Sequence, residues 1–107
     1  MSMSSQTAVP ASSVVIRGID ARTFSEMESF VKDLEGRPTE RLLRDLAKLA
    51  ELSSTKVSLV SYVLASKYRA AEPSDRQTMR ESVASTVETL PPGETRERVM
   101  QILERLR

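Results

Sequence analysis

The stretch STKVSLVSYVLASKYR, residues 54–69, contains no acidic residue, whereas the rest of the chain mixes its charges closely. As a strand it would need strict alternation of apolar and polar residues, which the pairs Leu59–Val60 and Val63–Leu64 break. A helix that is apolar over more than half of its circumference needs neighbours on two sides, so we expect the central, most buried helix of a small bundle. The residues of this broad face are Val57, Leu59, Val60, Val63, Leu64 and Tyr68.

The same helix keeps a narrow polar strip made of Ser58, Tyr62, Ser66 and Arg69. A second interpretation of the acid-free stretch is therefore a basic contact surface. Tyrosine is enriched among the residues that dominate binding energy, and Tyr62 on the polar strip is the better contact candidate. We expect Tyr68 to pack in the core with its hydroxyl at the edge.

Four further helices are expected around this one. The sequence TFSE, residues 23–26, has the pattern of a capping box and opens a helix that Gly36 closes. A second helix runs from Pro38 or Thr39 to Leu52, and the sequence LPPG at 90–93 ends a helix that Ser74 and Gln77 begin as another capping box. The last helix covers residues 94–107. The predicted fold is all-α, a compact five-helix bundle over residues 23–107 with a flexible N-terminal arm.

The arm, residues 1–22, is predicted to be disordered or extended. Residues 1–13 are rich in Ser, Ala and Thr, and Val14–Ile16 are three consecutive β-branched residues that favour an extended segment. This segment either packs weakly on its own domain or docks as a short strand on a partner.

Bulk composition argues against catalysis. The chain has 107 residues, a formal net charge of +1, and neither Cys nor His, which removes thiol nucleophiles, imidazole bases and the usual zinc ligands. The only glycines are Gly18, Gly36 and Gly93, so no Gly-rich phosphate loop exists. We therefore expect no enzyme, no catalytic residue, no cofactor and no metal. Without a signal-peptide pattern or an apolar run of about 18 residues, we expect a soluble intracellular protein of the cytoplasm or nucleus, with no membrane partner.

Basic residues concentrate between Gly36 and Ala70. Seven of them, namely Arg37, Arg41, Arg44, Lys48, Lys56, Lys67 and Arg69, stand against only Glu40, Asp45 and Glu51. If several share a face they could follow nucleic-acid phosphates, although no aromatic or Gly-rich element accompanies them. Alternatively they solvate the second helix and pair with the acidic first helix.

Protein binding is the favoured function. Helices of this number leave grooves between neighbours, and a groove with an aliphatic floor and a basic rim suits an acidic or phosphorylated peptide or an amphipathic helix. We predict a non-catalytic adaptor or assembly subunit, with a nucleic-acid-binding domain as the alternative. A homodimer through Val99, Ile102 and Leu106 of the last helix is a further alternative. The predicted partner-binding residues are Arg41, Arg44, Lys48, Tyr62, Lys67 and Arg69.

One resemblance extends over residues 24–107. The segment RPTERLLRDLAKLAEL, followed by the long central helix and by ETRERVMQILERLR, resembles in hydrophobic pattern the α-helical domains that bind the phosphorylated C-terminal tail of RNA polymerase II. Those domains have more helices, and they carry an aromatic-rich helix of the YLLDSI type where this chain has TMRESV. The resemblance implies a helical fold and a phosphorylated peptide partner, and no site residue is carried over from it.

Overall fold

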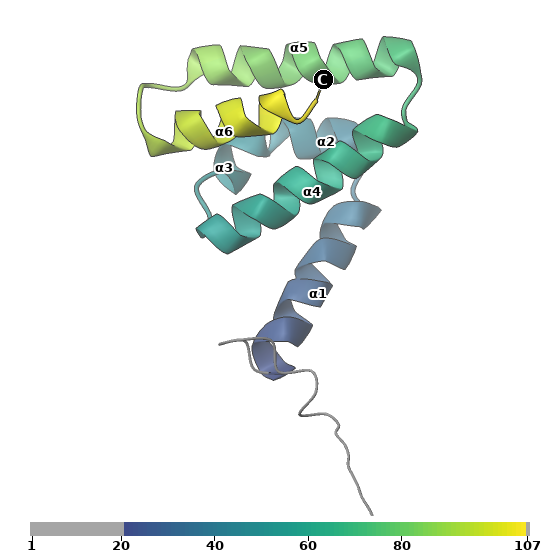
Figure 1. Ribbon diagram of the computed structural model, residues 1–107, viewed down its shortest axis with the longest axis vertical. Coiled ribbons are helices and arrows are strands. Elements are labelled where there is room, and N and C mark those ends of the chain that lie inside the picture. The colour runs from purple at the N-terminus through teal and green to yellow at the C-terminus, as the bar shows by residue number, and fades with distance from the viewer. Residues whose placement is uncertain (1–20, 107) are drawn as a thin grey trace, which may run out of the picture. The chain divides into compact units, whose positions relative to one another are not determined.

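The computed structural model describes residues 21–106, which form six α-helices and no β-strand. These are α1 (Ala21–Gly36), α2 (Thr39–Arg44), α3 (Leu46–Leu49), α4 (Ser54–Ala70), α5 (Pro73–Thr89) and α6 (Glu94–Glu104) (Figure 1). The predicted all-α class is confirmed. The chain divides into two units, residues 1–32 and 33–107. Most of the predicted arm, including Val14–Ile16, lies outside the described residues.

Helix α1 starts and ends differently from the prediction. It begins at Ala21, so Thr23 lies inside the helix and the predicted capping box does not mark its start. Gly36 is the last helical residue and has no positive φ, and the helix closes with the Arg37 amide donating to the Leu34 carbonyl at 3.1 Å. Leu34 is the one buried residue of α1, and Phe24 is exposed.

The predicted second helix is divided into α2 and α3, which is why six helices appear where five were expected. Asp45 between them has φ −91° and ψ 4°, outside the helical region. Backbone hydrogen bonds still bridge the irregularity, because the Asp45 amide donates to Arg41 and the Leu49 amide donates to Asp45. The Asp45 carboxylate lies 3.6 Å from Arg37 and 3.7 Å from Arg41, so the side chain of the irregular residue has two arginine partners.

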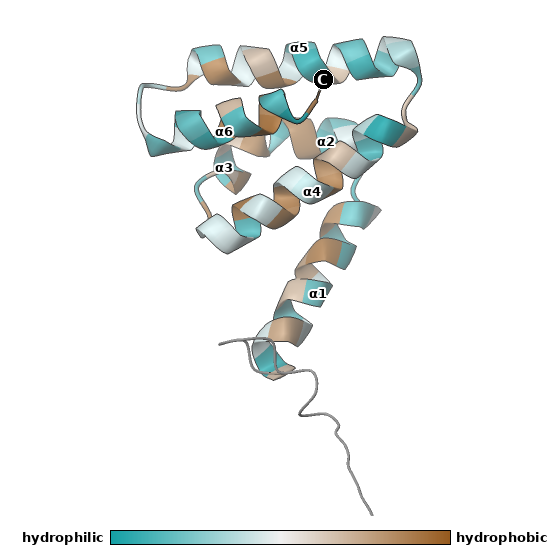
Figure 2. Ribbon diagram, in the orientation of Figure 1, coloured by the Kyte–Doolittle hydropathy of each residue, from teal (hydrophilic) through white to brown (hydrophobic). Residues whose placement is uncertain are grey.

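Helix α4 is the most buried element, as its sequence predicts. It contributes seven buried residues, against three from α5 and two from α6. Its apolar side packs beneath α2, α3 and α5, whereas the polar strip of Ser58, Tyr62, Ser66 and Arg69 is exposed. Burial explains the apolar face of this helix, but seven of residues 54–69 are exposed, so burial alone does not account for the absence of acidic residues. Figure 2 shows the apolar residues of α4 along the helix.

Helices α5 and α6 run antiparallel and form the most extensive contact between any two helices of the described chain (Figure 1). The predicted start of α5 is wrong: the helix begins at Pro73 after an N-cap residue, Glu72, that makes no side-chain hydrogen bond. Gln77 donates to Glu81 instead of reaching back toward Ser74. The connection to α6 needs glycine, since Gly93 has φ 154°.

The predicted dimer seam, formed by Val99 and Ile102 of α6 and by Leu106 just beyond its end, is part of the protein's own core. Val99 and Leu106 have no exposed surface and Ile102 is only 2% exposed. These side chains pack inside the bundle, so a homodimer cannot use them without opening the fold.

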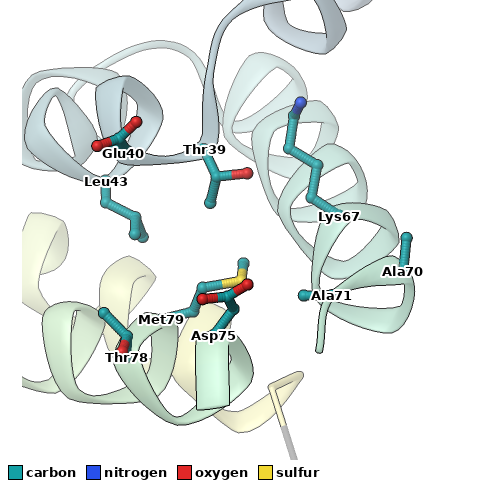
Figure 3. Close-up of a pocket in the computed structure, with 9 residues that line it drawn as sticks. All are labelled: Thr39, Glu40, Leu43, Lys67, Ala70, Ala71, Asp75, Thr78 and Met79. Atoms are coloured by element: carbon teal, nitrogen blue, oxygen red, sulfur yellow. The ribbon is translucent and has the colours of Figure 1, made fainter. Parts of the chain in front are cut away.

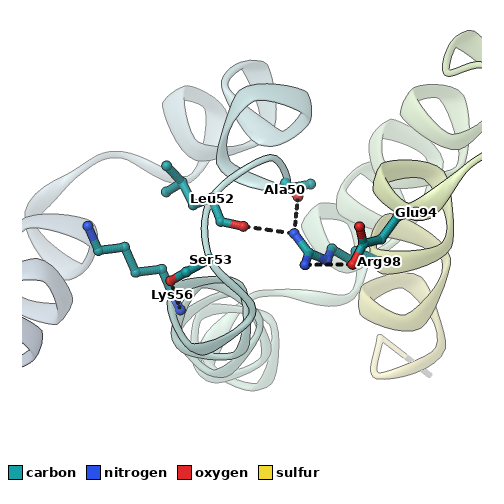
Figure 4. Close-up of polar contacts among 6 residues, drawn as sticks. All are labelled: Ala50, Leu52, Ser53, Lys56, Glu94 and Arg98. Atoms are coloured by element: carbon teal, nitrogen blue, oxygen red, sulfur yellow. Dashed lines mark hydrogen bonds and ion pairs between the residues drawn. The ribbon is translucent and has the colours of Figure 1, made fainter.

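Arginine side chains connect neighbouring helices by donating hydrogen bonds to backbone carbonyls. Arg98 of α6 donates to the carbonyls of Ala50 at 3.1 Å and Leu52 at 2.7 Å, where the chain leaves α3, and it pairs with Glu94 at 2.9 Å (Figure 4). Arg76 of α5 donates to the carbonyls of Tyr68 and Arg69 at the end of α4. These contacts satisfy carbonyls that a helix end leaves without partners.

The aromatic ring of Tyr68 is also fixed by arginine. The side chain is 7% exposed, as predicted for a core residue, and the guanidinium groups of Arg76 and Arg80 lie 5.6 and 5.8 Å from its ring centre. Arg80 also donates to the Tyr68 hydroxyl. The hydroxyl therefore has a partner at the edge of the core.

Candidate functional site

A cleft of about 690 Å³ lies between α2, α4 and α5 of the second unit. Figure 3 shows Leu43 and Met79 approaching one another across this cleft from α2 and α5. The residues around it are Thr39, Glu40, Leu43, Lys67, Ala70, Ala71, Asp75, Thr78 and Met79. The volume lies within the range of pockets that hold small molecules or the side chains of a docked peptide.

Helical spacing brings these residues to one place. Thr39, Glu40 and Leu43 share one side of α2, because residues three and four apart are neighbours on a helix. Asp75, Thr78 and Met79 are related in the same way on α5. The two small residues at the end of α4, Ala70 and Ala71, leave space between the helices that larger side chains would fill.

Both signs of charge surround the cleft. Glu40 and Asp75 are exposed, and no ion pair joins either carboxylate to another of the described residues. Lys67 faces the cleft from α4 and donates through its ammonium to the Glu35 carbonyl at 3.1 Å. The uniformly basic rim expected from the sequence is therefore absent here, since two carboxylates stand beside one ammonium.

Three of the predicted partner-binding residues lie on the outer side of α2 and α3. Arg41, Arg44 and Lys48 are all exposed and follow the spacing i, i+3, i+7, which places them on one helical face. Arg41 pairs with Asp45 at 3.7 Å, whereas neither Arg44 nor Lys48 forms an ion pair with another described residue. None of the three lines the cleft.

The other three predicted residues divide between two sides of α4. Tyr62 is 56% exposed and lies with Arg69 on the polar strip. Lys67 lies on a different side of the helix and is the only predicted site residue that borders the cleft. The predicted set is thus spread over three surfaces instead of forming one groove.

Sequence reasoning missed most of the cleft. Leu43 belongs to a predicted apolar stripe, yet it is only partly buried, and Met79 is 3% exposed at the cleft floor. The acids Glu40 and Asp75 occupy first helical turns, where a carboxylate is explained by the helix dipole alone. The one usable signal was the pair Ala70–Ala71, small residues at the meeting point of two helices.

Comparison with known proteins adds no functional information. No protein-family model, no curated protein and no solved structure matches this chain. The resemblance in hydrophobic pattern to polymerase-tail-binding domains therefore stays a prediction. Within residues 21–106, no group of three or more acidic side chains is placed to hold a metal ion. None of the helices in that range is both long and apolar enough to cross a bilayer.

Proposed function

We propose that this protein is a non-catalytic interaction module, an adaptor or assembly subunit, that binds a segment of another protein in the cleft between α2, α4 and α5. The observation that carries the proposal is the cleft itself, which combines an apolar floor at Leu43 and Met79 with charged side chains at its border. An amphipathic helix or short peptide fits such a groove, with one apolar residue entering it and polar residues at the rim.

The charges at the border define the partner's chemistry. Glu40 and Asp75 can form ion pairs with a basic residue of the partner, and Lys67 can form one with an acidic residue. The acidic or phosphorylated partner expected from composition is therefore replaced by a segment of mixed charge with an apolar anchor. Charge complementarity of this kind fixes the orientation of the bound segment more than its affinity.

A peptide library displayed on phage tests the proposal without a known partner. The protein is used as bait, and selected peptides are then measured against Ala70→Trp and Ser66→Trp. Ala70 is exposed and borders the cleft, so a tryptophan there fills the groove without entering the core. Ser66 lies on the polar strip of the same helix and is a control for an added indole.

The expected result is a set of peptides that share an apolar residue next to a basic one. Their affinity should fall at least about tenfold with Ala70→Trp, the loss of about 1.4 kcal/mol, and remain unchanged with Ser66→Trp. Asp75→Asn should weaken the peptides that carry the basic residue. A selection that returns no binder sensitive to Ala70→Trp refutes the cleft as a docking site.

Nucleic-acid binding is the second candidate, favoured by the exposed Arg44 and Lys48 on the outer side of α2 and α3. Its test is fluorescence anisotropy with a labelled DNA duplex across a salt series. Each neutralised phosphate contributes a slope of about −0.9 in log affinity against log salt. If nucleic acid binds through this face, the slope of log affinity against log salt should become less negative in Arg44→Gln and in Lys48→Gln and should not change in Ala70→Trp. Loss of binding in Ala70→Trp would contradict it.

A further inference from the structure

A second, smaller hollow lies between α4 and α6, on residues that the proposed function does not use. Its volume is about 100 Å³, several times the roughly 30 Å³ that a water molecule occupies in the liquid. It is too small for a peptide segment and large enough for one compact polyatomic group. Its polar residues are Ser58, Ser61, Arg98, Gln101 and Arg105.

The lining of this hollow consists of hydrogen-bond donors and apolar surface. The buried side chains of Val57 and Ile102 complete it, and no carboxylate is among its residues. Two guanidinium groups, two hydroxyls and one amide can all donate to an oxyanion. The cleft of the proposed function differs in this respect, because Glu40 and Asp75 border it.

Ser61 supplies the hollow with a hydroxyl that is available for a hydrogen bond. Its side chain is the one buried polar residue of the described core, at 8% exposure, and it lines the hollow. No hydrogen bond joins its hydroxyl to another residue in the described range, in contrast to Thr78 and Thr86, whose hydroxyls donate to carbonyls four residues earlier. The hydroxyl oxygen is not among the buried polar atoms that lack a partner, so it reaches solvent in the hollow and is available to a bound oxyanion.

The arginines retain donors for such a group. A guanidinium has five N–H donors, and Arg98 uses three of them, two on the carbonyls of Ala50 and Leu52 and one on Glu94. Two N–H groups of Arg98 are therefore left. Arg105 is exposed at the end of α6 and forms no ion pair with another residue of the described chain.

We propose that the hollow between α4 and α6 binds a single phosphate group, held by Arg98 and Arg105 and by the hydroxyls of Ser58 and Ser61. Planar guanidinium groups bind phosphate oxygens through paired, charge-assisted hydrogen bonds. The group is either free inorganic phosphate or the phosphate of a phosphorylated side chain, since both present the same oxygens.

Amide-resolved NMR on the full chain tests this proposal. The ¹⁵N-labelled protein is titrated with inorganic phosphate in one arm and with a capped phosphoserine peptide in the other. Sodium chloride holds the ionic strength constant, which separates binding from general screening. The expected result is saturable shifts at Ser58, Ser61, Gln101 and Arg105, with the amides around the α2–α4–α5 cleft unaffected.

Two variants and one control assign the site. Arg105→Gln should raise the dissociation constant about tenfold, the effect of losing one charge-assisted hydrogen bond. Ser61→Ala should weaken binding by a smaller factor. Arg69→Gln, an equal change of charge on the exposed strip of α4, should leave it unchanged. Each substituted protein must first give a spectrum of the folded protein.

The two arms distinguish the source of the phosphate, and both of those outcomes support the site. Tighter binding of the phosphoserine peptide indicates a phosphorylated partner, whereas binding of inorganic phosphate alone indicates the free ion. The absence of saturable shifts in both arms, or equal affinity in Arg105→Gln and the wild type, overturns the proposal. Either result leaves the cleft untested, so the two proposals fail independently.

Discussion

The clamp that Arg98 forms between α6 and the end of α3 should be a major source of stability. Replacement by methionine, Arg98→Met, keeps the packing of the aliphatic stem and removes the guanidinium. The Ala50 carbonyl then loses its charged donor inside the protein, which we expect to cost about 2 kcal/mol. Leu52 is partly exposed, so water can replace part of its bond and its loss should cost about 1 kcal/mol. The sum is about 3 kcal/mol.

Urea denaturation followed by far-UV circular dichroism measures this loss. The matched control is Glu94→Gln, which removes the ion pair, on a side chain that is 77% exposed, and one first-turn carboxylate of α6 while leaving the bonds to both carbonyls in place. An exposed pair four residues apart contributes about 0.3–0.5 kcal/mol. The loss of free energy of unfolding in Arg98→Lys should lie between those of Arg98→Met and Glu94→Gln, because one ammonium group cannot reproduce the planar set of donors of a guanidinium. If Arg98→Met lowers the free energy of unfolding no more than Glu94→Gln does, the carbonyl clamp is not stabilising and the reasoning is wrong.

Three further predictions concern helix ends, each measured as a change in the free energy of unfolding by urea denaturation. Ser53→Ala should lower the free energy of unfolding by about 0.5–1 kcal/mol, because Ser53 is the N-cap of α4 and accepts from the Lys56 amide at 3.3 Å. Ser74→Ala should change little, and equal losses in the two variants would contradict the observed caps. Gly93→Ala should cost about 1–3 kcal/mol because of its φ of 154°, and Gly36→Ala should stabilise the helical position by about 0.5–1 kcal/mol. If Gly36→Ala destabilised the protein more than Gly93→Ala, the backbone conformations assigned to these two glycines would be wrong. Arg76→Gln should cost about 2 kcal/mol through its lost bonds to two carbonyls at the end of α4, and a loss below about 0.5 kcal/mol would exclude that role.

Hydrophobic periodicity predicted the helices well because burial controls it. The wide apolar face of residues 54–69 correctly indicated the most buried helix, and Tyr68 and the polar strip lie as expected. Helix boundaries were predicted less well. The capping-box patterns at Thr23 and Ser74 satisfy a local rule, yet both helices begin before those residues. A side chain that could cap is not used when the preceding residues already adopt helical geometry.

The candidate site was harder to predict, because it depends on which helix faces meet. The basic residues between Gly36 and Ala70 were counted as one group, although their directions around two helices send them to different surfaces. A cleft forms where side chains are too small to fill the space between helices, and that depends on the crossing of α2, α4 and α5. Spacing along one helix carries no information about such a crossing.

Several arginines of this chain are structural, and this changes what its composition means for function. Arg98 and Arg76 place their charges on carbonyls at the ends of α3 and α4, where the helix dipole is negative. Arg37 lies 2.8 Å from Asp33 and 3.6 Å from Asp45, so its charge is compensated as well. A count of basic residues therefore overstates the positive surface that a partner meets. Arg44 and Arg105, which are exposed and form no ion pair among the described residues, belong to different helices, α2 and the end of α6, which favours local recognition of single groups over tracking of a polyanion.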